Sequence, residues 1–524
     1  MIFSFLILVS FSIISFLSPC GKAATFDNKN YVGNYLNKST SEVKTKVAII
    51  GAGAGGSSAA YYLQKYTNST IFDITIFEKN SYIGGRSTTI DFPIDSKYDD
   101  LNIEKMKIEL GASIFTSANE ILTEAVNTFG LSMSGDDDSN SDSDSSSSSS
   151  FAVWNGKKIV YTFTESSWSV WTIIKMLFTF GISVIKVENL KDTVVDNFIN
   201  NFYDTHFPFD SLNTIVPESD LAESTSKTAE NLFIDNSISE KYRYEFIQPL
   251  TRVNYAQDLD VIDGLGALVT VSATSAGSVS GGNWQIFENF IEASNANLSL
   301  NTAISKISKL DNNQFLISYN DVDSQGEDDL ETFDIVILAA PMEQTNITYD
   351  FEFNKNTEIA DTEYVSLHVT IFSTTKKISN GDSYFSAENV PQSVLTTESD
   401  GKSSTDPIFN SLNQIGYIKE TKEYIYKIFS MQELDISTVT SFFKNKKNSK
   451  NDIEINNFYH KHWNSYPILK PITKFNEFEL DSDGFYYLNS MESFISTMET
   501  SALAGANVAA LISSGLNTTQ LIVP

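Results

Sequence analysis

A run of glycines near the start of the chain has the spacing of a nucleotide-binding loop. Residues 51–56 read Gly-Ala-Gly-Ala-Gly-Gly, directly after the apolar run KVAII at 46–50. In the pattern G-x-G-x-x-G the first glycine makes a tight turn, the second lets the backbone approach a pyrophosphate, and the third allows close helix-to-strand packing. The following helix offers free N–H groups to the anion. The sequence therefore predicts a dinucleotide-binding loop made of Gly51, Ala52, Gly53, Ala54, Gly55 and Gly56.

An acidic residue stands at the position that this kind of loop requires. A helix is predicted over about 57–66 and a second strand over 74–78, which ends at Glu78, 22 residues after Gly56. A carboxylate there accepts hydrogen bonds from the adenosine ribose. The competing interpretation is a plain glycine turn followed by an unrelated acid. Strand, helix and acid together favour the dinucleotide site.

A second glycine pair narrows the choice of nucleotide. Glu78-Lys79 is followed by Gly84-Gly85-Arg86-Ser87, an order that resembles the signature of the amine-oxidase-like flavoproteins. The resemblance implies that the doublet and Arg86 approach the diphosphate of FAD. Arginine is a bidentate cation for phosphate, and glycine permits close backbone contact. A structural turn is the alternative, but an NAD-dependent dehydrogenase has no need of these additions.

Three later segments resemble parts of the same flavoproteins. Glu109-Leu-Gly111-Ala112-Ser113 resembles the segment beside the flavin, and 297–307 resembles the strand whose backbone contacts adenine, which places Ile304 at that contact. The stretch 484–505 resembles the closing strand and helix, whose N-terminus points at the flavin. Ordinary helix-start chemistry is an equal interpretation of Glu499. The predicted FAD-binding residues are Gly51, Ala52, Gly53, Ala54, Gly55, Gly56, Glu78, Lys79, Gly84, Gly85, Arg86, Ser87, Gly111, Ala112, Ile304 and Glu499, with no metal site.

Four further motifs resemble the prenylcysteine oxidase (farnesylcysteine lyase) family. They are Leu250-Thr-Arg252-Val-Asn254-Tyr255-Ala-Gln257, Gly281-Gly282-Asn283, Trp463-x-x-Tyr466-Pro467 and the ending YYLN to METSA. The resemblance covers most of residues 45–513, and the acidic insert at 136–150 departs from it. It implies FAD-dependent oxidation by O₂ of the thioether in S-farnesyl- or S-geranylgeranyl-cysteine, which gives prenyl aldehyde, cysteine and H₂O₂ during degradation of prenylated proteins.

The sequence does not decide which side chains contact the substrate. Asn254, Tyr255 and Gln257 either line the substrate site or belong to a buried hydrogen-bonding strand, and no catalytic side chain is assigned. Two rival functions also remain. One is another exported FAD oxidase of the same fold that acts on an amine or a polyene, because a fold does not determine a substrate. The other is a secreted flavin-binding glycoprotein without catalysis.

The elements that must position these motifs lie at both ends of the chain. Buried strands are predicted at 46–50, 74–78, 334–340 and 484–488, so the nucleotide domain is assembled from separated segments. The predicted fold class is α/β (α+β overall), a Rossmann-type FAD domain with an inserted mixed substrate domain. The predicted order is 45–115 (FAD), 116–260 (substrate and helical, with the low-complexity loop 136–150), 261–345 (FAD), 346–470 (substrate) and 471–524 (FAD).

The apolar segment Trp168–Val187 has three interpretations. A core helix of the substrate domain is favoured, since core helices are often apolar all round. A wall of a prenyl channel or a peripheral membrane contact is the second interpretation, because the implied substrate is lipid-like. A transmembrane helix is the least favoured, because glycine and lysine interrupt a barely sufficient length. The stretch 151–159 alternates like a single strand.

Composition excludes several classes of function. A net charge of −30 argues against nucleic acid, which requires a basic footprint. The four histidines form no metal or triad pattern, and the pair His460-x-His462 is interpreted as strand or surface. The single cysteine, Cys20, lies in the leader, so the processed chain would have no thiol chemistry.

The first residues predict export. Ile2–Leu17 is apolar and is followed by small residues, so residues 1–24 are interpreted as a signal peptide and 25–44 as a linker. An uncleaved anchor is the alternative. Five N-x-S/T sequons, at Asn37, Asn68, Asn297, Asn346 and Asn517, agree with export. We expect the lysosome as the destination, with secretion as the alternative.

Overall fold

A computed structural model describes residues 44–515, with gaps. The gaps are 68–70, 135–149, 165–169, 274–275, 324–325, 354–358, 360, 379–383, 386, 388–389, 399–406 and 445–452. The predicted signal peptide, the linker up to residue 43, most of the acidic insert and the sequons at 37, 68 and 517 therefore lie outside the described residues.

A six-stranded sheet forms the centre of the nucleotide-binding part. Its order is β18-β19-β11-β1-β2-β7, and every neighbouring pair is parallel except β18 with β19. Three stretches far apart in the sequence supply these strands, which confirms the prediction of a Rossmann-type domain built from separated segments. The strands are β1 (Thr45–Ile50), β2 (Phe72–Phe77), β7 (Asn297–Ser299), β11 (Ile335–Leu338), β18 (Glu479–Asp481) and β19 (Phe485–Tyr487).

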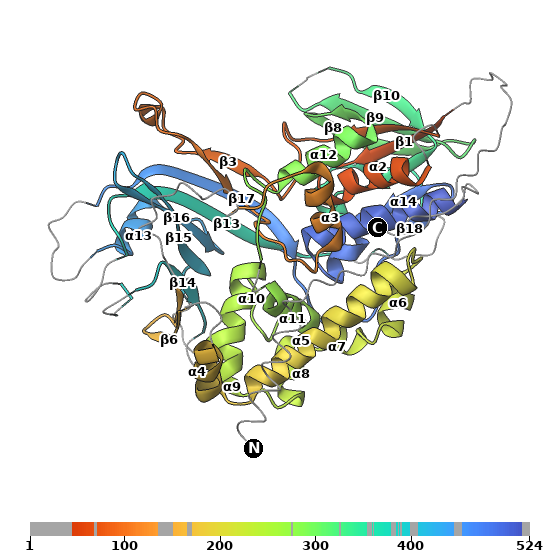
Figure 1. The fold of residues 1–524 in the computed structure, drawn as a ribbon. Helices are drawn as coiled ribbons and strands as arrows, with labels where there is room; N and C mark the ends of the chain where they lie inside the picture. Colours follow the sequence, from red (N-terminus) through yellow and green to blue (C-terminus); the bar gives the residue numbers. More distant parts are fainter. Residues whose placement is uncertain are drawn as a thin grey trace. The chain divides into compact units, whose positions relative to one another are not determined.

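Both faces of this sheet are covered. Val47 and Ile49 face a core shared with α2 (Ala54–Thr67) and α14 (Met498–Gly515), whereas Ala48 and Ile50 face a second core. Helix α12 (Trp284–Ser294) packs against α2 on the first face, as Figure 1 shows. The other face carries a four-stranded sheet of β8 (Thr302–Lys309), β9 (Phe315–Asp321), β10 (Asp329–Phe333) and β12 (Thr348–Tyr349). Burial on both faces explains the unbroken apolar run of β1.

Small residues let α14 cross α2 closely. A side chain at Gly505 would bring its Cβ within 2.3 Å of Gly55 O, so the backbones of the two helices nearly touch. Ser58 Oγ donates to Ala502 O at 2.6 Å in the same crossing. The predicted C-terminal helix is thereby placed against the first turn of α2, beside the glycine loop.

The chain also forms a second large sheet, which has seven strands. Its order is β17-β13-β16-β15-β14-β5-β6, antiparallel throughout except for the pair β14 and β5. A hairpin of β3 and β4 packs on one face through a shared apolar core. The strands are β3 (Thr89–Phe92), β4 (Met106–Glu109), β5 (Ser150–Trp154), β6 (Ile159–Thr164), β13 (Tyr364–Thr374), β14 (Ser393–Thr396), β15 (Ser411–Ile418), β16 (Glu423–Ser430) and β17 (Asn456–Pro467).

Helices occupy most of the chain between β6 and β7. Helix α11 packs against α5, α7 and α8, and α10 reaches β14 of the large sheet. The α-helices outside the nucleotide sheet are α3 (Glu120–Phe129), α4 (Val170–Phe180), α5 (Ser183–Ile199), α6 (Leu212–Glu218), α7 (Ala222–Ser226), α8 (Ala229–Asp235), α9 (Glu240–Tyr242), α10 (Gln248–Tyr255), α11 (Gly264–Ser272) and α13 (Ile436–Ser441). Shorter helical turns cover Ser96–Tyr98, Asn200–Thr205, Arg243–Ile247, Met342–Gln344 and Leu488–Ser493.

Three expected elements differ from the sequence interpretation. Trp168–Val187 is not one helix, because Gly181 adopts φ +67° and separates α4 from α5. The stretch 151–159 contains a turn between β5 and β6, so it is not a single strand. The segment with Asn254 and Tyr255 is the end of helix α10, not a strand. Among the described residues, no helix combines the length and apolarity that a membrane span needs.

Candidate functional site

Two glycines of the loop are required by the fold itself. Gly51 has φ +112°, and its N–H donates to Phe77 O at 2.8 Å, which joins the end of β1 to the end of β2. A Cβ at Gly56 would lie 2.0 Å from Gly51 O and 3.1 Å from the Ile49 side chain. Any larger residue at position 56 would push α2 off the strand. This is the packing role that the motif predicts for its third glycine.

The middle glycine faces free space. A Cβ at Gly53 would meet only Gly84 O, at 3.9 Å. The second glycine pair lies directly beside the loop, since Gly84 N donates to Ala52 O at 2.9 Å and Gly53 forms a bridge with Gly84. The first turn of α2 leaves its N–H groups without intrahelical acceptors. Free backbone donors beside an open space form a cradle that suits a pyrophosphate.

The acidic residue at the end of β2 is held in place. Glu78 is buried, and its Oε2 accepts from Ala52 N at 2.9 Å. Its Oε1 accepts from both nitrogens of Asn80, at 2.8 and 2.6 Å. Carboxylate oxygens have further lone pairs for ribose hydroxyls. Thr302 N donates to Glu78 O at 2.9 Å, so the strand of Ile304 lies beside the predicted ribose partner.

Two of the predicted residues lie around this cradle without direct evidence of contact. Ile304 is 8% exposed on β8, and its side chain belongs to the core beneath the sheet. Only its backbone could therefore contact adenine, which is the contact that the sequence predicts. Lys79 is exposed. Both assignments stay predictions.

The structure gives the side chain of Arg86 a different partner from the predicted phosphate. Its guanidinium forms an ion pair with Glu492 and donates to Ser465 O at 2.7 Å. Tyr364 Oη also donates to Glu492, at 2.9 Å. Burial alone would lower the pKa of Arg86, but Glu492 outweighs it and the pKa is raised. Glu492 neutralises this cation within the protein, whereas the loop N–H groups and the positive end of the α2 dipole are available to a diphosphate. The assignment of Arg86 to the diphosphate stays a prediction.

The segment 109–113 extends the site from the glycine doublet. Ala112 N donates to Arg86 O at 3.1 Å, and a Cβ at Gly111 would lie 2.1 Å from the same oxygen. Ser87 is buried and its Oγ donates to Met498 Sδ at 3.3 Å, at the start of α14. The segment around the doublet, the predicted flavin-flanking segment and the closing helix are thus in contact with one another.

Two orphaned polar atoms mark the border of this region. Glu109 Oε2 and Ser465 Oγ are buried, and neither has a hydrogen-bond partner among the described residues. Both residues adjoin the doublet, since Ser465 O accepts from Arg86 and Glu109 leads into Gly111. Buried polar groups without partners are rare in folded proteins and often adjoin a bound group. Together with the open space at Gly53, they fit a polar cofactor such as FAD.

Glu499 has a structural partner instead of a cofactor contact through its side chain. Its oxygens accept from Ile121 N at 2.8 Å, from Leu122 N at 3.0 Å and from the Tyr203 hydroxyl. Ile121 and Leu122 lie in the first turn of α3, and the side chain of its N-cap residue, Asn119, makes no capping hydrogen bond to the helix. The carboxylate therefore caps a neighbouring helix. Any contact of Glu499 with a cofactor has to be made by its backbone.

Sequence reasoning did not single out a buried lysine beside the flavin-flanking segment. Lys427 on β16 is 8% exposed, and its Nζ donates to Glu109 O at 2.6 Å and to Ser113 Oγ at 3.4 Å. Glu109 Oε1 accepts from Asn283 N at 2.7 Å. Burial lowers the pKa of Lys427 to about 8 and raises the pKa of Glu109 to about 7. The sequence feature that could have identified Lys427 is its place within EYIYKIFS, a strand with apolar residues on both faces.

The motif around Tyr255 joins α10 to the closing segments. The ring of Tyr255 meets Tyr466 edge-on at 5.5 Å, and its hydroxyl donates to Ser496 O at 3.3 Å. Gln257 accepts from Leu469 N at 2.8 Å and donates to Pro467 O at 3.1 Å, and Asn254 donates to Leu250 O within its own helix. Gln257 and Asn254 therefore make structural hydrogen bonds, and the Tyr255–Tyr466 pair is bonded to the chain two residues before α14.

Three histidines lie together on the large sheet, as the strand interpretation of the H-x-H pair implies. His368 Nδ1 and His460 Nε2 are 2.8 Å apart, and Ser366 Oγ is 2.8 Å from His462 Nε2. Burial lowers the pKa of His368. Over the described ranges no group of three His, Cys, Asp or Glu side chains could hold a metal ion.

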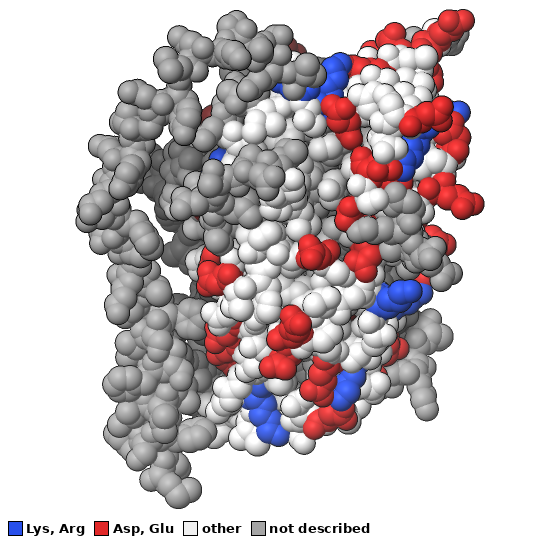
Figure 2. All heavy atoms as spheres, turned by 90° about the vertical axis from the view of Figure 1, so that its right-hand side faces the viewer, with Lys and Arg blue, Asp and Glu red and all other residues white. Residues whose placement is uncertain are grey.

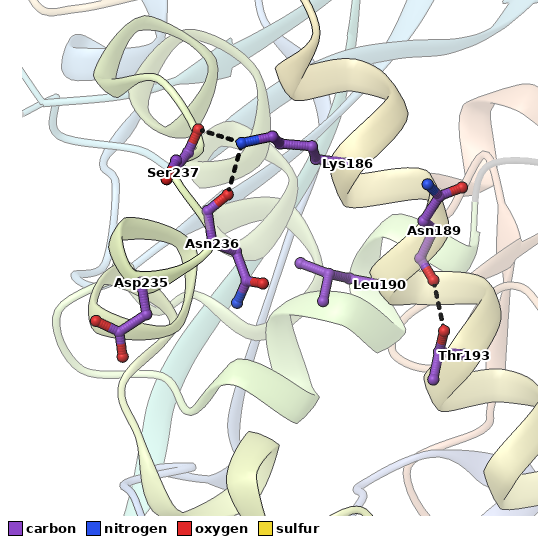
Figure 3. A pocket seen from close by; sticks show the side chains of 7 residues that line it. All are labelled: Lys186, Asn189, Leu190, Thr193, Asp235, Asn236 and Ser237. Atoms are coloured by element: carbon purple, nitrogen blue, oxygen red, sulfur yellow. Dashed lines mark hydrogen bonds between the residues drawn. The ribbon is translucent and has the colours of Figure 1, made fainter.

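A surface depression elsewhere lacks these features. It lies between α5 and the turn after α8, and Figure 3 shows Lys186 donating to the carbonyls of Asn236 and Ser237 inside it. Its lining contains no glycine loop and no residue of the cradle. We therefore place the candidate site at the glycine loop. Carboxylates are scattered over the face shown in Figure 2, in agreement with the net charge of −30.

Comparison with known proteins agrees with this geometry. Residues 49–129 match the NAD(P)-binding Rossmann-like domain, and residues 163–523 match the prenylcysteine lyase family. Farnesylcysteine lyase of Arabidopsis thaliana is 28% identical over 90% of this chain and 89% of its own, and human prenylcysteine oxidase 1 is 27% identical over 89% and 88%. A redesigned putrescine oxidase has the same fold, with a TM-score of 0.55 and 14% identity over 90% of this chain and 99% of its own.

These matches settle the class of the protein. It has the fold of the flavin-dependent amine oxidases, its cofactor is FAD, and it is an oxidoreductase. The family match covers more than half of the chain and includes most strands of the large sheet as well as the closing helix. The chain belongs to the prenylcysteine lyase family.

Proposed function

We propose that this protein is an FAD-dependent thioether oxidase that cleaves S-farnesyl- or S-geranylgeranyl-cysteine to the prenyl aldehyde and cysteine, with O₂ as acceptor and H₂O₂ as product. One observation carries the proposal. The family match extends through 163–523, so it includes the substrate-side sheet and helices and not only the nucleotide fold. Relatives named farnesylcysteine lyase and prenylcysteine oxidase align along nine-tenths of the chain. The proposed setting is the degradation of prenylated proteins.

Different residues bind the cofactor and surround the substrate in a way that suits this reaction. When bound, FAD would supply the acceptor for a hydride, which carries two electrons, from the carbon attached to sulfur. The loop around Gly53 and the α2 N-terminus hold its diphosphate, and Glu78 holds its ribose. The Tyr255–Tyr466 pair provides an apolar wall beside the start of α14. A dry wall excludes water until the thioether has been oxidised.

Substrate-dependent bleaching of the flavin tests the proposal. Under anaerobic conditions farnesylcysteine should reduce the flavin of the purified holoprotein, and admission of O₂ should restore the oxidised spectrum with formation of H₂O₂. Putrescine and cyclohexylamine, offered in parallel, should leave the spectrum unchanged. Reduction by the amines alone would show an amine oxidase. A flavin that stays oxidised with every substrate would show a binding protein without catalysis.

We also propose that the protein travels through the secretory pathway, with the lysosome as its destination. The apolar leader supports export. The two sequons within the described part of the chain agree with it, because Asn297 and Asn346 are both exposed and therefore accessible to glycosylation. Enzymatic removal of N-glycans should lower the apparent mass of the protein from an exporting cell, and an unchanged mass would count against this route.

An apolar tip at the junction of α4 and α5 supports a peripheral contact with lipid. Phe178 is 88% exposed and Ile182 is 64% exposed, one turn apart on either side of Gly181. Lys175 is exposed one turn earlier, and Lys241 Nζ lies 5.7 Å from the ring of Phe180. Large exposed apolar side chains next to lysines are typical of surfaces that enter the headgroup region of a membrane. Because the chain is acidic, the apolar residues have to supply most of the attraction.

The double variant Phe178→Ser, Ile182→Ser tests this contact. We expect it to lose most of its cosedimentation with vesicles of phosphatidylcholine and phosphatidylserine, while turnover of detergent-dispersed farnesylcysteine stays unchanged. Ile436→Ser is the matched control, since Ile436 is 50% exposed on α13. Equal vesicle binding by all three proteins would rule out the proposed contact.

A further inference from the structure

A buried amine lies where an aliphatic side chain would suit the fold better. Lys427 points from β16 into the space between the large sheet and the β3–β4 hairpin, the region of the Val369, Ile371 and Ile425 core. Its Nζ lies 4.8 Å from the ring of Phe429, and the two acceptors that it has among the described residues, Glu109 O and Ser113 Oγ, are both uncharged. Lysines are almost never this buried without an ionic partner.

The contacts of this lysine place it next to the predicted flavin-flanking segment. Its two acceptors, Glu109 O and Ser113 Oγ, flank Gly111 and Ala112. On its other side the same segment is bonded to the doublet, through Ala112 N to Arg86 O and Leu110 N to Thr88 O. One short stretch of backbone therefore separates Lys427 from the glycine cradle. An ammonium has three protons and these contacts use two, so one position is left for a further partner.

The charged surroundings of Lys427 are simple. Its cross-strand neighbours are Ile371 on β13 and Asn413 on β15, neither of which titrates. Glu109, at the end of β4, is the titrating group that acts on it. Burial lowers the pKa of Lys427 to about 8, and the pKa of Glu109 is raised to about 7 by its own burial. Lys427 can therefore take up and release a proton near neutral pH, which an exposed lysine cannot do.

We propose that Lys427 transfers protons in the steps that follow oxidation of the thioether. The inference rests on the proposed function. Once a hydride has passed to the cofactor, the positive charge is shared by carbon and sulfur. A water molecule adds through its oxygen, a C–O bond forms, and the neutral amine of Lys427 takes one proton of that water.

The second step returns this proton. The hemithioacetal loses its hydroxyl proton to solvent as the C=O bond forms and the C–S bond breaks. The departing cysteine thiolate then takes the proton held by Lys427. In sum, thioether, FAD and water give aldehyde, cysteine, reduced cofactor and one proton. A cysteine thiol has an ordinary pKa of about 8.5, so an ammonium of similar acidity suits it as a proton donor.

The variant Lys427→Arg separates this function from a merely structural one. Arginine keeps the positive charge and the donors toward Glu109 O, but it cannot be deprotonated in a protein. In single turnover with farnesylcysteine we expect the rate of flavin reduction to stay near that of the wild type. Release of cysteine should slow by about 100-fold, the usual contribution of proton transfer. Lys427→Met should behave similarly, and Lys461→Met is the control, since Lys461 Nζ stacks on Trp463 of its own strand, β17.

Two measurements keep the inference testable if either variant folds poorly. In the wild type, cysteine release should accelerate with pH through an apparent pKa near 8. Without substrate, the visible spectrum of the bound flavin should shift over the same pH range, and the shift should be absent in Lys427→Met. Cysteine release by Lys427→Arg at the wild-type rate, or equal slowing of flavin reduction and release, would overturn the assignment. Failure of wild-type protein to reduce its flavin would instead overturn the proposed function.

Discussion

Replacing Gly53 by alanine is expected to leave the apoprotein folded and to weaken FAD binding by about 10- to 100-fold. A Cβ at this position meets only Gly84 O, at 3.9 Å, and the backbone is not in the left-handed region, so the protein accommodates the methyl group. The methyl group instead occupies the space over the free N–H groups of α2. Crowding of this kind costs about 1–3 kcal/mol, and 1.4 kcal/mol corresponds to tenfold in affinity.

Gly56→Ala provides the contrasting variant from the same loop. Its Cβ would lie 2.0 Å from Gly51 O, so this substitution should destabilise the apoprotein as well as the complex. Thermal unfolding of both apoproteins and FAD titration by fluorescence quenching measure the two effects separately. Wild-type FAD affinity in Gly53→Ala would show that the diphosphate does not lie in front of Gly53. An equal loss of apoprotein stability in both variants would show that the loop serves packing alone.

The nucleotide-binding sheet could be predicted from the sequence because its strands carry their own signal. VAII at 47–50 is apolar at every residue, and the structure buries alternate side chains of β1 in two different cores. The glycine spacing fixed the turn that follows, since Gly51 and Gly56 meet a steric need within six residues of each other. Local sequence contains everything that such an element requires.

Partners that depend on distant residues could not be predicted in this way. Arg86 pairs with Glu492, which lies 406 positions away, and nothing in the residues around Arg86 distinguishes that partner from a phosphate. The break at Gly181 is similar, because an apolar run does not reveal whether one helix or two will bury it. Lys427 was missed because a single lysine in a strand is read as a solvent-facing residue until the neighbouring hairpin is known to cover it.

The buried charges around the cradle have different consequences for binding. In the Arg86–Glu492 ion pair each charge is neutralised by the other, and the pair joins the glycine doublet to the last helical turn before α14. Glu109 and Lys427 can each form a further hydrogen bond, since within the described part of the chain Glu109 Oε2 has no partner and Lys427 has one unused donor position. A buried ion pair contributes mainly to the geometry of a site. Unpaired groups with shifted pKa values are the ones suited to move protons.

Glu499→Ala is expected to destabilise the protein by at least about 3 kcal/mol, because three buried donors lose their acceptor at about 1–3 kcal/mol each. Those donors are Ile121 N, Leu122 N and the Tyr203 hydroxyl. Tyr203→Phe removes only one of them and should cost less. Urea unfolding of the apoprotein gives both values. A variant as stable as the wild type that no longer retains FAD would show that Glu499 is a cofactor ligand after all.

The pH dependence of the same variant gives an independent check. Burial raises the pKa of Glu499 to about 7 in the folded protein, against an ordinary value of 4.5 in the unfolded chain. Between these values the folded state holds a proton that the unfolded state releases, so this group stabilises the protein below pH 4.5 and loses that contribution as the pH rises through about 7. The stability gap between wild type and Glu499→Ala should therefore narrow from pH 4.5 to 7.5, and a gap that widens would contradict the burial of this carboxyl group.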